Sequence, residues 1–359
     1  MICLGLALAA QIYQQNLPVQ QREPLHDPVS QLIASHRTLA SRQGPLGYLP
    51  ALLDALHINP DSQALVFSKT SFQSQKISPR NPRAIYFNDN VAVGYVPGGE
   101  VMELASLEPT QGVVFYTLDS RANFTRRDVC LKCHQGPATQ GVPGIFIGSV
   151  FPNALGAPSR SAAIVTDHRT RFADRWGGWF VDAAHGEQPD RANRVASDPA
   201  EPESLDTRVA KAFDRTAYLS ATSDIVALMT FEHQTQIVNL LTRLNWEARM
   251  PETPAAQLES DLDSAAAYLL FRNEAPLKEP VAGVSSFSRT FPLRGPLREY
   301  DLRTRLFRYP LSYMIFSPAF EALPEELRAR LCRRVSARVS REVREIVIAA
   351  RPEWKGYFK

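Results

Sequence analysis

The hydrophobic residues in the first half of the chain occur in short runs that alternate with polar positions, a pattern typical of β-strands. Runs rich in β-branched and aromatic residues occupy 64–71, 83–89, 91–96, 101–107 and 112–118. Turn sequences such as Pro97-Gly98-Gly99 separate them, and this close spacing favours antiparallel neighbours. Shorter runs of the same kind follow at 144–151, 162–167 and 177–184. The pattern therefore predicts an antiparallel meander with further strands after it.

Beyond about residue 207, the apolar positions recur at intervals of three and four residues, as they do on one face of a helix. Helices are predicted over 223–250, 255–272 and about 324–350, with shorter helical pieces at 32–40 and 49–57. Polar and proline-rich loops are expected at 186–206 and 274–297. The predicted fold class is therefore α+β, with an antiparallel β-rich N-terminal half and a helical C-terminal half.

The predicted organisation is a polar and helical segment over 11–60, followed by one α+β domain over 60–359. Within that domain, 60–185 is β-rich and 207–359 is helical, and no linker-like composition separates the two parts. The formal net charge of the 359 residues is +3, which argues against nucleic acid as a partner. No apolar run reaches the ~18 residues of a transmembrane span.

The first ten residues, MICLGLALAA, resemble the hydrophobic part of a secretory signal peptide. No Lys or Arg precedes Arg22, so the positive start of such a peptide is missing and the signal is truncated. Residues 1–10, which include Cys3, are therefore expected to direct export, and the expected location is the periplasm or another exported compartment.

One short motif carries specific chemistry. Cys130-Leu131-Lys132-Cys133-His134 is a C-x-x-C-H sequence, the attachment pattern of a c-type haem. Two thiols at this spacing bond to the porphyrin, and the following His134 becomes the proximal iron ligand. A zinc site, a redox dithiol and a chance match are the alternatives, but zinc needs further ligands that the chain lacks nearby. The motif predicts one covalently attached haem c, and Cys332 is best explained as a core residue.

Segments along most of the chain, from 67 to 324, resemble a family of exported bacterial proteins with a single C-x-x-C-H, described as cytochrome c-like. The matching segments are FSKTSFQSQKISPRNPRAIYFNDNVAVGYVPGG, VCLKCHQG, GVPG, RWGGWFVDAAHG, ALMTFEHQ and LFRYPLSYMIFSPAFEALP. The resemblance implies haem binding and secretion and supplies no substrate. Where the family has a second His shortly after the His-Gly pair, this chain has Pro189-Asp190-Arg191-Ala192-Asn193.

The function depends on the iron ligand opposite His134. The candidate distal ligands are His185, His233, Met229 and Met314, with His168 as a weaker choice. Each of them also has an ordinary explanation as a core or turn residue. Candidate partners of the haem propionates are Arg83, Arg126, Arg127 and Arg175. Candidates for radical or acid–base chemistry are Tyr86, Tyr309, Tyr313, Asp89 and Glu232.

Three functions are compatible with these residues. The first is an exported monohaem cytochrome that transfers electrons to an unidentified redox partner, either a protein or a small molecule. The second is a haem-dependent peroxidase or oxidase with an open distal site, and the length of the chain beyond a minimal cytochrome favours a pocket or partner surface. The third is a module that binds or senses a diatomic gas. Whether the protein is an enzyme stays open at this point.

Overall fold

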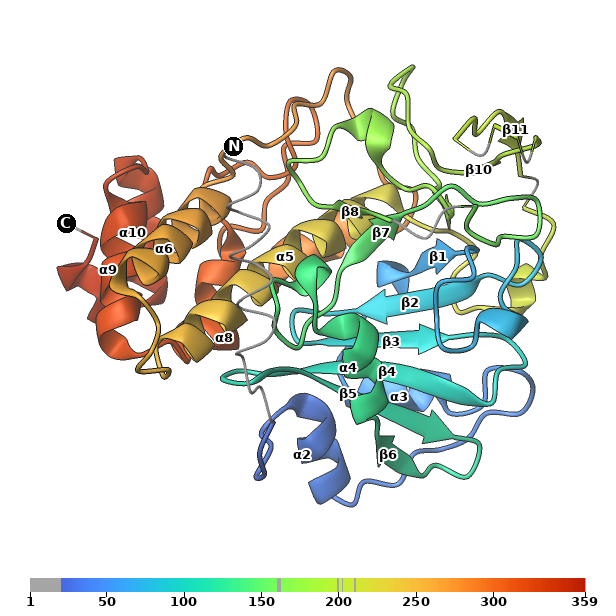
Figure 1. Cartoon of the computed structure of the whole chain (residues 1–359), viewed down its shortest axis with the longest axis horizontal. Helices are drawn as coiled ribbons and strands as arrows, with labels where there is room; N and C mark the ends of the chain where they lie inside the picture. Colours follow the sequence, from blue (N-terminus) through green and yellow to red (C-terminus); the bar gives the residue numbers. More distant parts are fainter. Residues whose placement is uncertain (1–20, 160–162, 199, 202, 210, 359) are drawn as a thin grey trace.

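A seven-stranded antiparallel sheet forms the centre of the computed structural model, which describes residues 21–159, 163–198, 200–201, 203–209 and 211–358 (Figure 1). The strand order is β6-β5-β4-β3-β2-β1-β9. Its strands are β1 (Ala64–Val66), β2 (Arg83–Phe87), β3 (Val91–Tyr95), β4 (Val101–Glu108), β5 (Gly112–Asp119), β6 (Phe124–Arg126) and β9 (Trp179–Phe180). The predicted meander is confirmed, because β1 to β6 pair in sequence order. The signal segment 1–10, Cys3 and the start of segment 11–60 lie outside the described residues.

Strand β1 ends earlier than the run at 64–71 predicts. The backbone N–H groups of Phe67 and Ser68 both donate to the carbonyl of Gly178, at 2.9 and 3.1 Å. Gly178 has a φ of +88°, and a Cβ there would lie 2.7 Å from the Ser68 side chain. The regular ladder therefore stops after Val66, since the chain turns away around a position that only glycine fills without a clash.

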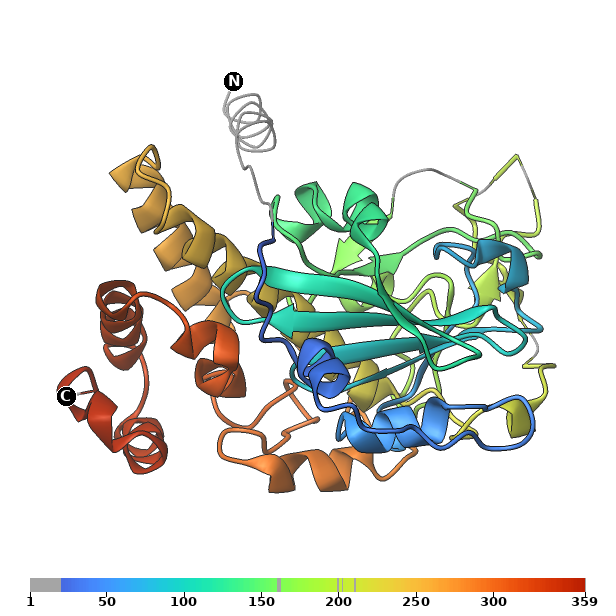
Figure 2. The ribbon, with the colours of Figure 1, turned by 90° about the horizontal axis from the view of Figure 1, so that it is seen from below.

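The two faces of the sheet carry different layers (Figure 2). Helices α2 (Pro28–Ala34) and α3 (Leu49–Ala55) pack on one face, and the C-x-x-C-H segment lies on the other. Asp27 caps α2 and accepts a hydrogen bond from the buried Tyr116 hydroxyl of β5 at 2.8 Å. The described part of segment 11–60 is therefore a covering layer of the sheet and not a free linker.

Helix α5 (Ile225–Glu247) is central to the fold, because 21 of its 23 residues are buried. Asp224 caps its N-terminus by accepting from the backbone N–H groups of Val226 and Ala227. The sequence suggests one apolar face, but the sheet and the C-terminal helices enclose α5 on all sides. Several of its polar residues find partners in the core; Gln234, for example, donates to the Asn88 carbonyl at 2.6 Å.

The single helix predicted over 324–350 is wrong, because the structure has two helices there. Helix α9 (Glu325–Ser336) ends before Ser340, whose hydroxyl accepts from the backbone N–H of Val343 and begins α10 (Arg341–Ala350). The break allows α10 to turn back, so that Val343 and Val347 are buried in the same core as the apolar side of α9. The other C-terminal helices are α6 (Ala255–Leu269), α7 (Phe287–Thr290) and α8 (Pro318–Glu321).

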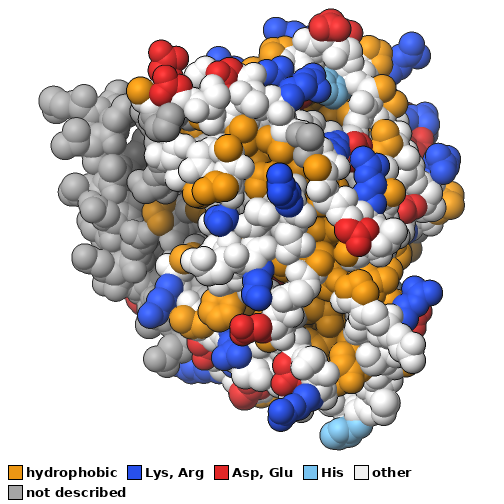
Figure 3. Space-filling model, turned by 90° about the vertical axis from the view of Figure 1, so that its right-hand side faces the viewer, with side chains coloured by type: hydrophobic (Ala, Val, Ile, Leu, Met, Phe, Trp, Pro, Cys, Tyr) orange, Lys and Arg blue, Asp and Glu red, His pale blue; other side chains and the backbone are white. Residues whose placement is uncertain are grey.

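Two small two-stranded antiparallel sheets complete the described architecture. Strands β7 (Ile147–Ser149) and β8 (Ile164–Thr166) form one, and β10 (Arg194–Val195) and β11 (Thr207–Arg208) form the other. The sheet and the C-terminal helices share one hydrophobic core, which confirms the α+β class. The side of the molecule near β10 and β11 shows apolar patches between charges of both signs (Figure 3). In the described part of the chain, no helix has both the length and the apolarity needed to cross a bilayer.

Candidate haem-attachment site

The C-x-x-C-H motif occupies a short helical segment directly after β6. Cys130 ends the 3₁₀ turn Asp128–Cys130, and the one-turn helix α4 (Leu131–His134) follows it. Cys130 is half-buried and Cys133 is exposed, and neither is bonded to another described cysteine. The backbone of Arg127 donates to the Phe115 carbonyl at 2.8 Å, which fixes the segment to β5. Both thiols are therefore held on one rigid turn at the edge of the core.

The ring of His134 is oriented by hydrogen bonding to the chain ten residues later. Its Nδ1 lies 3.1 Å from the carbonyl oxygen of Gly144, and the Gly144 N–H donates to the His134 carbonyl at 2.9 Å. Because a carbonyl only accepts, Nδ1 carries the proton and the lone pair of the neutral ring is on Nε2. Burial lowers the pKa of His134, which favours this neutral form. No described residue forms a hydrogen bond with Nε2, the atom that a metal would use.

Aromatic packing holds the same ring from two sides. The Phe115 and Phe146 rings lie with their centres 4.8 and 5.8 Å from that of His134. Gly144 allows the loop to approach helix α5, since a Cβ there would lie 2.1 Å from Oδ1 of Asn239. Asn239 also donates to the Ile145 carbonyl at 2.9 Å. The motif and its loop are therefore docked on both β5 and α5.

Two of the four arginines proposed as propionate partners lie at the motif. Arg83 forms an ion pair with Glu103 at 2.7 Å. Burial is the main cause of the lowered pKa of His134; the Arg83 charge adds to this lowering and the Glu103 charge opposes it. Arg127 donates to the Thr117 hydroxyl at 3.0 Å and lowers the pKa of Cys130, although burial raises it overall. Arg126 is paired with Glu23 and Asp128 instead. Arg175 is buried elsewhere, against Glu232.

The candidate distal ligands contact residues other than His134. On α5, His233 precedes Asn239 by six residues, which is about 9 Å along the axis and about 240° around it. Its contacts are with Tyr268 and Phe271, on the side of the helix that faces α6. The imidazole of His185 pairs with Asp190, at 3.3 Å from Nε2 to Oδ2. Met229 and Met314 are 3% and 1% exposed and pack in the hydrophobic core.

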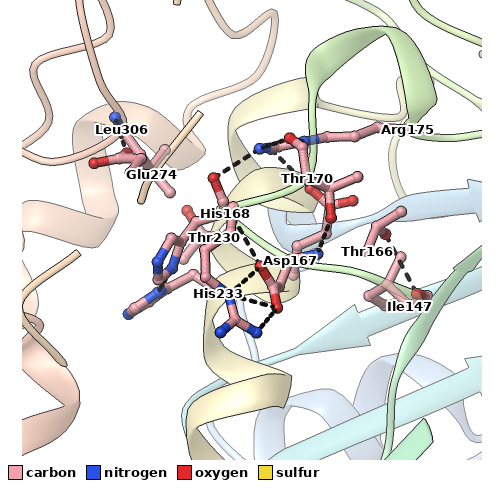
Figure 4. Close-up of polar contacts among 12 residues, drawn as sticks. Ile147, Thr166, Asp167, His168, Thr170, Arg175, Thr230, His233, Glu274 and Leu306 are labelled. Carbon is pink, nitrogen blue, oxygen red and sulfur yellow. Dashed lines mark hydrogen bonds and ion pairs between the residues drawn. The ribbon is translucent and has the colours of Figure 1, made fainter. Parts of the chain in front are cut away.

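His233 instead pairs with His168, a contact that the sequence analysis missed (Figure 4). Their Nδ1 atoms lie 2.8 Å apart, and Nε2 of His233 lies 2.7 Å from the Ser312 hydroxyl. Burial lowers the pKa of both imidazoles well below the ordinary value, so both are neutral. With both ring nitrogens of His233 in hydrogen bonds, this side chain has no lone pair to offer a metal. The sequence gives little sign of this contact, because His168 lies in the turn after β8 and His233 lies 65 residues later.

Charged residues surround the histidine pair. Arg175 contacts Glu232 at 3.3 Å and also donates to the backbone carbonyls of His168 and Thr170. Asp167 and Arg169, which flank His168 in the chain, form an ion pair with each other. Burial raises the pKa of Glu232 to about 7, although Arg175 opposes the rise. The histidines, Arg175 and Glu232 are buried whereas Arg169 is exposed, and the network joins the turn after β8 to α5.

The remaining acid–base and radical candidates are also held away from the motif. The Tyr86 hydroxyl donates to Gln63 at 2.6 Å within the core, on the sheet face that α2 and α3 cover. Asp89 is paired with Arg298, and the Arg298 guanidinium lies 4.2 Å from the ring centre of Tyr313. Tyr309 packs beside Arg308, 5.1 Å from its guanidinium carbon. These side chains form separate clusters and no shared site.

Comparisons with protein-family models, with curated proteins and with solved structures found no match to this chain. Within the described ranges, no three His, Cys, Asp or Glu side chains converge as a metal-ligand group. The donor set at the motif fits a covalently bound haem with one protein ligand. Cys133 is exposed, Cys130 is half-buried, and His134 presents Nε2 in the correct tautomer.

Proposed function

We propose that this protein is an exported, monohaem c-type cytochrome-like protein that transfers electrons. Cys130 and Cys133 would hold the haem covalently, and Nε2 of His134 would be the proximal ligand. When bound, a haem c supplies one-electron redox chemistry. The observation that carries the proposal is the Nδ1–H of His134 donating to the Gly144 carbonyl, since it leaves Nε2 free on the same helical turn as both thiols.

The position of the motif supports electron transfer. Cys133 and Lys132 are exposed, so a redox partner would reach this turn without a change in the fold. Leu131 of the motif is partly buried and packs on the main core, as Ile145 does next to Gly144. These apolar side chains would contact the porphyrin, and Arg83 and Arg127 would lie near enough to neutralise its carboxylates.

One observation favours a second candidate. His233 and His185 are engaged in other contacts, and Met229 and Met314 lie in the core. The contacts of the His134 ring are with Phe115, Phe146 and the Gly144 carbonyl. An iron without a strong distal ligand would bind peroxide or a diatomic gas. This leaves a haem-dependent peroxidase or oxidase, or a gas-binding module, as the alternative.

The experiment is an optical spectrum of the exported protein, oxidised and reduced, with and without carbon monoxide. A low-spin spectrum that carbon monoxide does not change would support electron transfer. A high-spin spectrum that shifts with carbon monoxide would overturn electron transfer in favour of the alternative, and peroxide turnover would then be measured.

Attachment is tested separately by cysteine substitution. C130A and C133A are each expected to lose double covalent attachment, and the double variant is expected to retain no haem on a denaturing gel. The matched control is C332A, because Cys332 is fully buried in α9 and far in sequence from the motif. Persistent covalent haem in the C130A/C133A variant would refute the proposal.

A further inference from the structure

A second site lies in the C-terminal half, away from the C-x-x-C-H motif. An open cleft of about 520 Å³ is lined by the chain that follows α6, by the 304–305 loop, and by Pro310 and Arg338. The volume is that of a small-molecule site. Phe271 is in its lining and is 5% exposed; behind it lies the buried His168–His233 pair, with the His233 ring 4.5 Å from the Phe271 ring. Glu274 is another lining residue, and Figure 4 shows it together with the histidine pair.

The lining of the cleft has an excess of positive charge. Arg272, Arg305 and Arg338 line it, against the single carboxylate of Glu274. Arg272 forms no ion pair with any described residue. Among the residues that the structure describes, Arg338 donates only to the backbone carbonyl of Arg334, at 3.0 Å. Guanidinium groups that share a cleft without matching carboxylates repel one another, and an anion would relieve that repulsion.

Arg305 is held in place before any ligand arrives. Its Nη2 donates to Glu274 at 2.8 Å, and the other Glu274 oxygen accepts from the Leu306 N–H at 2.9 Å. Its guanidinium carbon also lies 5.2 Å from the centre of the Phe271 ring. The Nε atom of Arg305 is buried and has no hydrogen-bond partner in the described structure. The side chain as a whole is 25% exposed, so the rest of the guanidinium group is within reach of a ligand in the cleft.

We propose that this cleft binds a small dianion through Arg272, Arg305 and Arg338, with the carboxylate or phosphate class as the ligand chemistry. The guanidinium groups would form charge-assisted hydrogen bonds to the anion oxygens. Arg305 would supply the fixed donor, whereas the exposed Arg272 and Arg338 would supply mobile charges that close over the ligand. The proposal does not depend on haem binding, because none of these residues contacts the motif.

The test is isothermal titration of the full-length exported protein with inorganic phosphate and, separately, with succinate, each against sodium chloride at matched ionic strength. The variant is R272M/R338M, which changes two exposed side chains. The control is R303M, because Arg303 is an exposed arginine in the same loop that does not line the cleft. Arg305→Lys tests the fixed donor with its charge retained, and thermal unfolding establishes that each variant is folded.

Saturable binding of either anion is expected, at least tenfold weaker in R272M/R338M and unchanged in R303M. Binding of phosphate alone would identify a phosphate-bearing ligand, and binding of succinate alone a dicarboxylate. If neither anion binds more strongly than chloride, or if R272M/R338M binds as tightly as the unaltered protein, the proposal is overturned.

Discussion

Glu232 should make the stability of this protein depend on pH, and Glu232→Gln should remove that dependence. The side chain is fully buried at 0% exposure, and burial raises its pKa from the ordinary 4.5 to about 7. Between these values the unfolded chain releases a proton that the folded protein keeps. The contribution of Glu232 to stability therefore falls as pH rises from about 4.5 to 7 and is constant above that.

The size of the effect follows from the two pKa values. At about 1.4 kcal/mol for each pH unit, the interval from 4.5 to about 7 corresponds to about 3 kcal/mol of unfolding free energy. Glutamine has nearly the same shape and does not ionise, so E232Q should lack this loss. Any cost of placing an amide beside Arg175 is the same at every pH and does not enter the comparison.

The assay is urea unfolding followed by circular dichroism, at pH values from 4 to 8.5. Relative to the unaltered protein, E232Q should gain about 3 kcal/mol between pH 4.5 and pH 7. The control E353Q changes a carboxylate that is 64% exposed, and its profile should follow that of the unaltered protein. Parallel profiles for E232Q and the unaltered protein would refute the reasoning.

Three further outcomes are expected. Gly144→Ala should destabilise the motif loop by about 2 kcal/mol or more, because the new Cβ would lie 2.1 Å from Asn239 Oδ1, and Asn239→Ala should recover part of the loss in a double-mutant cycle. Tyr116→Phe should cost about 1–3 kcal/mol in urea unfolding, since the 2.8 Å hydrogen bond to Asp27 is buried; an unchanged midpoint would contradict this. Burial also raises the pKa of Glu247 to about 8, so stability should fall as pH rises from 4.5 towards 8, and Glu247→Gln should flatten that part of the profile.

Features that depend on neighbours in the sequence were predictable. The strands β2 to β5 begin within one residue of their predicted runs, because alternating side chains and Pro-Gly turns act over a few residues. The cap at Asp224 and the start of α5 follow from the same local chemistry. The C-x-x-C-H motif is also local, since its two thiols and His134 occupy one helical turn whatever surrounds them.

Features that depend on packing were not predictable from one sequence. Whether His233 faces an iron or a second histidine depends on which element lies against its side of α5, and His168 comes from the turn after β8, 65 residues earlier. The break between α9 and α10 also depends on packing between distant parts of the chain. A short cap at Ser340 outweighs continuous helical spacing only because turning back buries Val343 and Val347.

The sequence by itself determined the antiparallel meander, the helical second half and the motif that predicts a haem, because each is specified by residues a few positions apart. Only the tertiary structure decided that His134 Nδ1 is bound to Gly144, that the candidate distal ligands lie elsewhere, and that three arginines share a cleft with one glutamate. These arrangements join residues tens of positions apart, and burial and packing across the whole core select them.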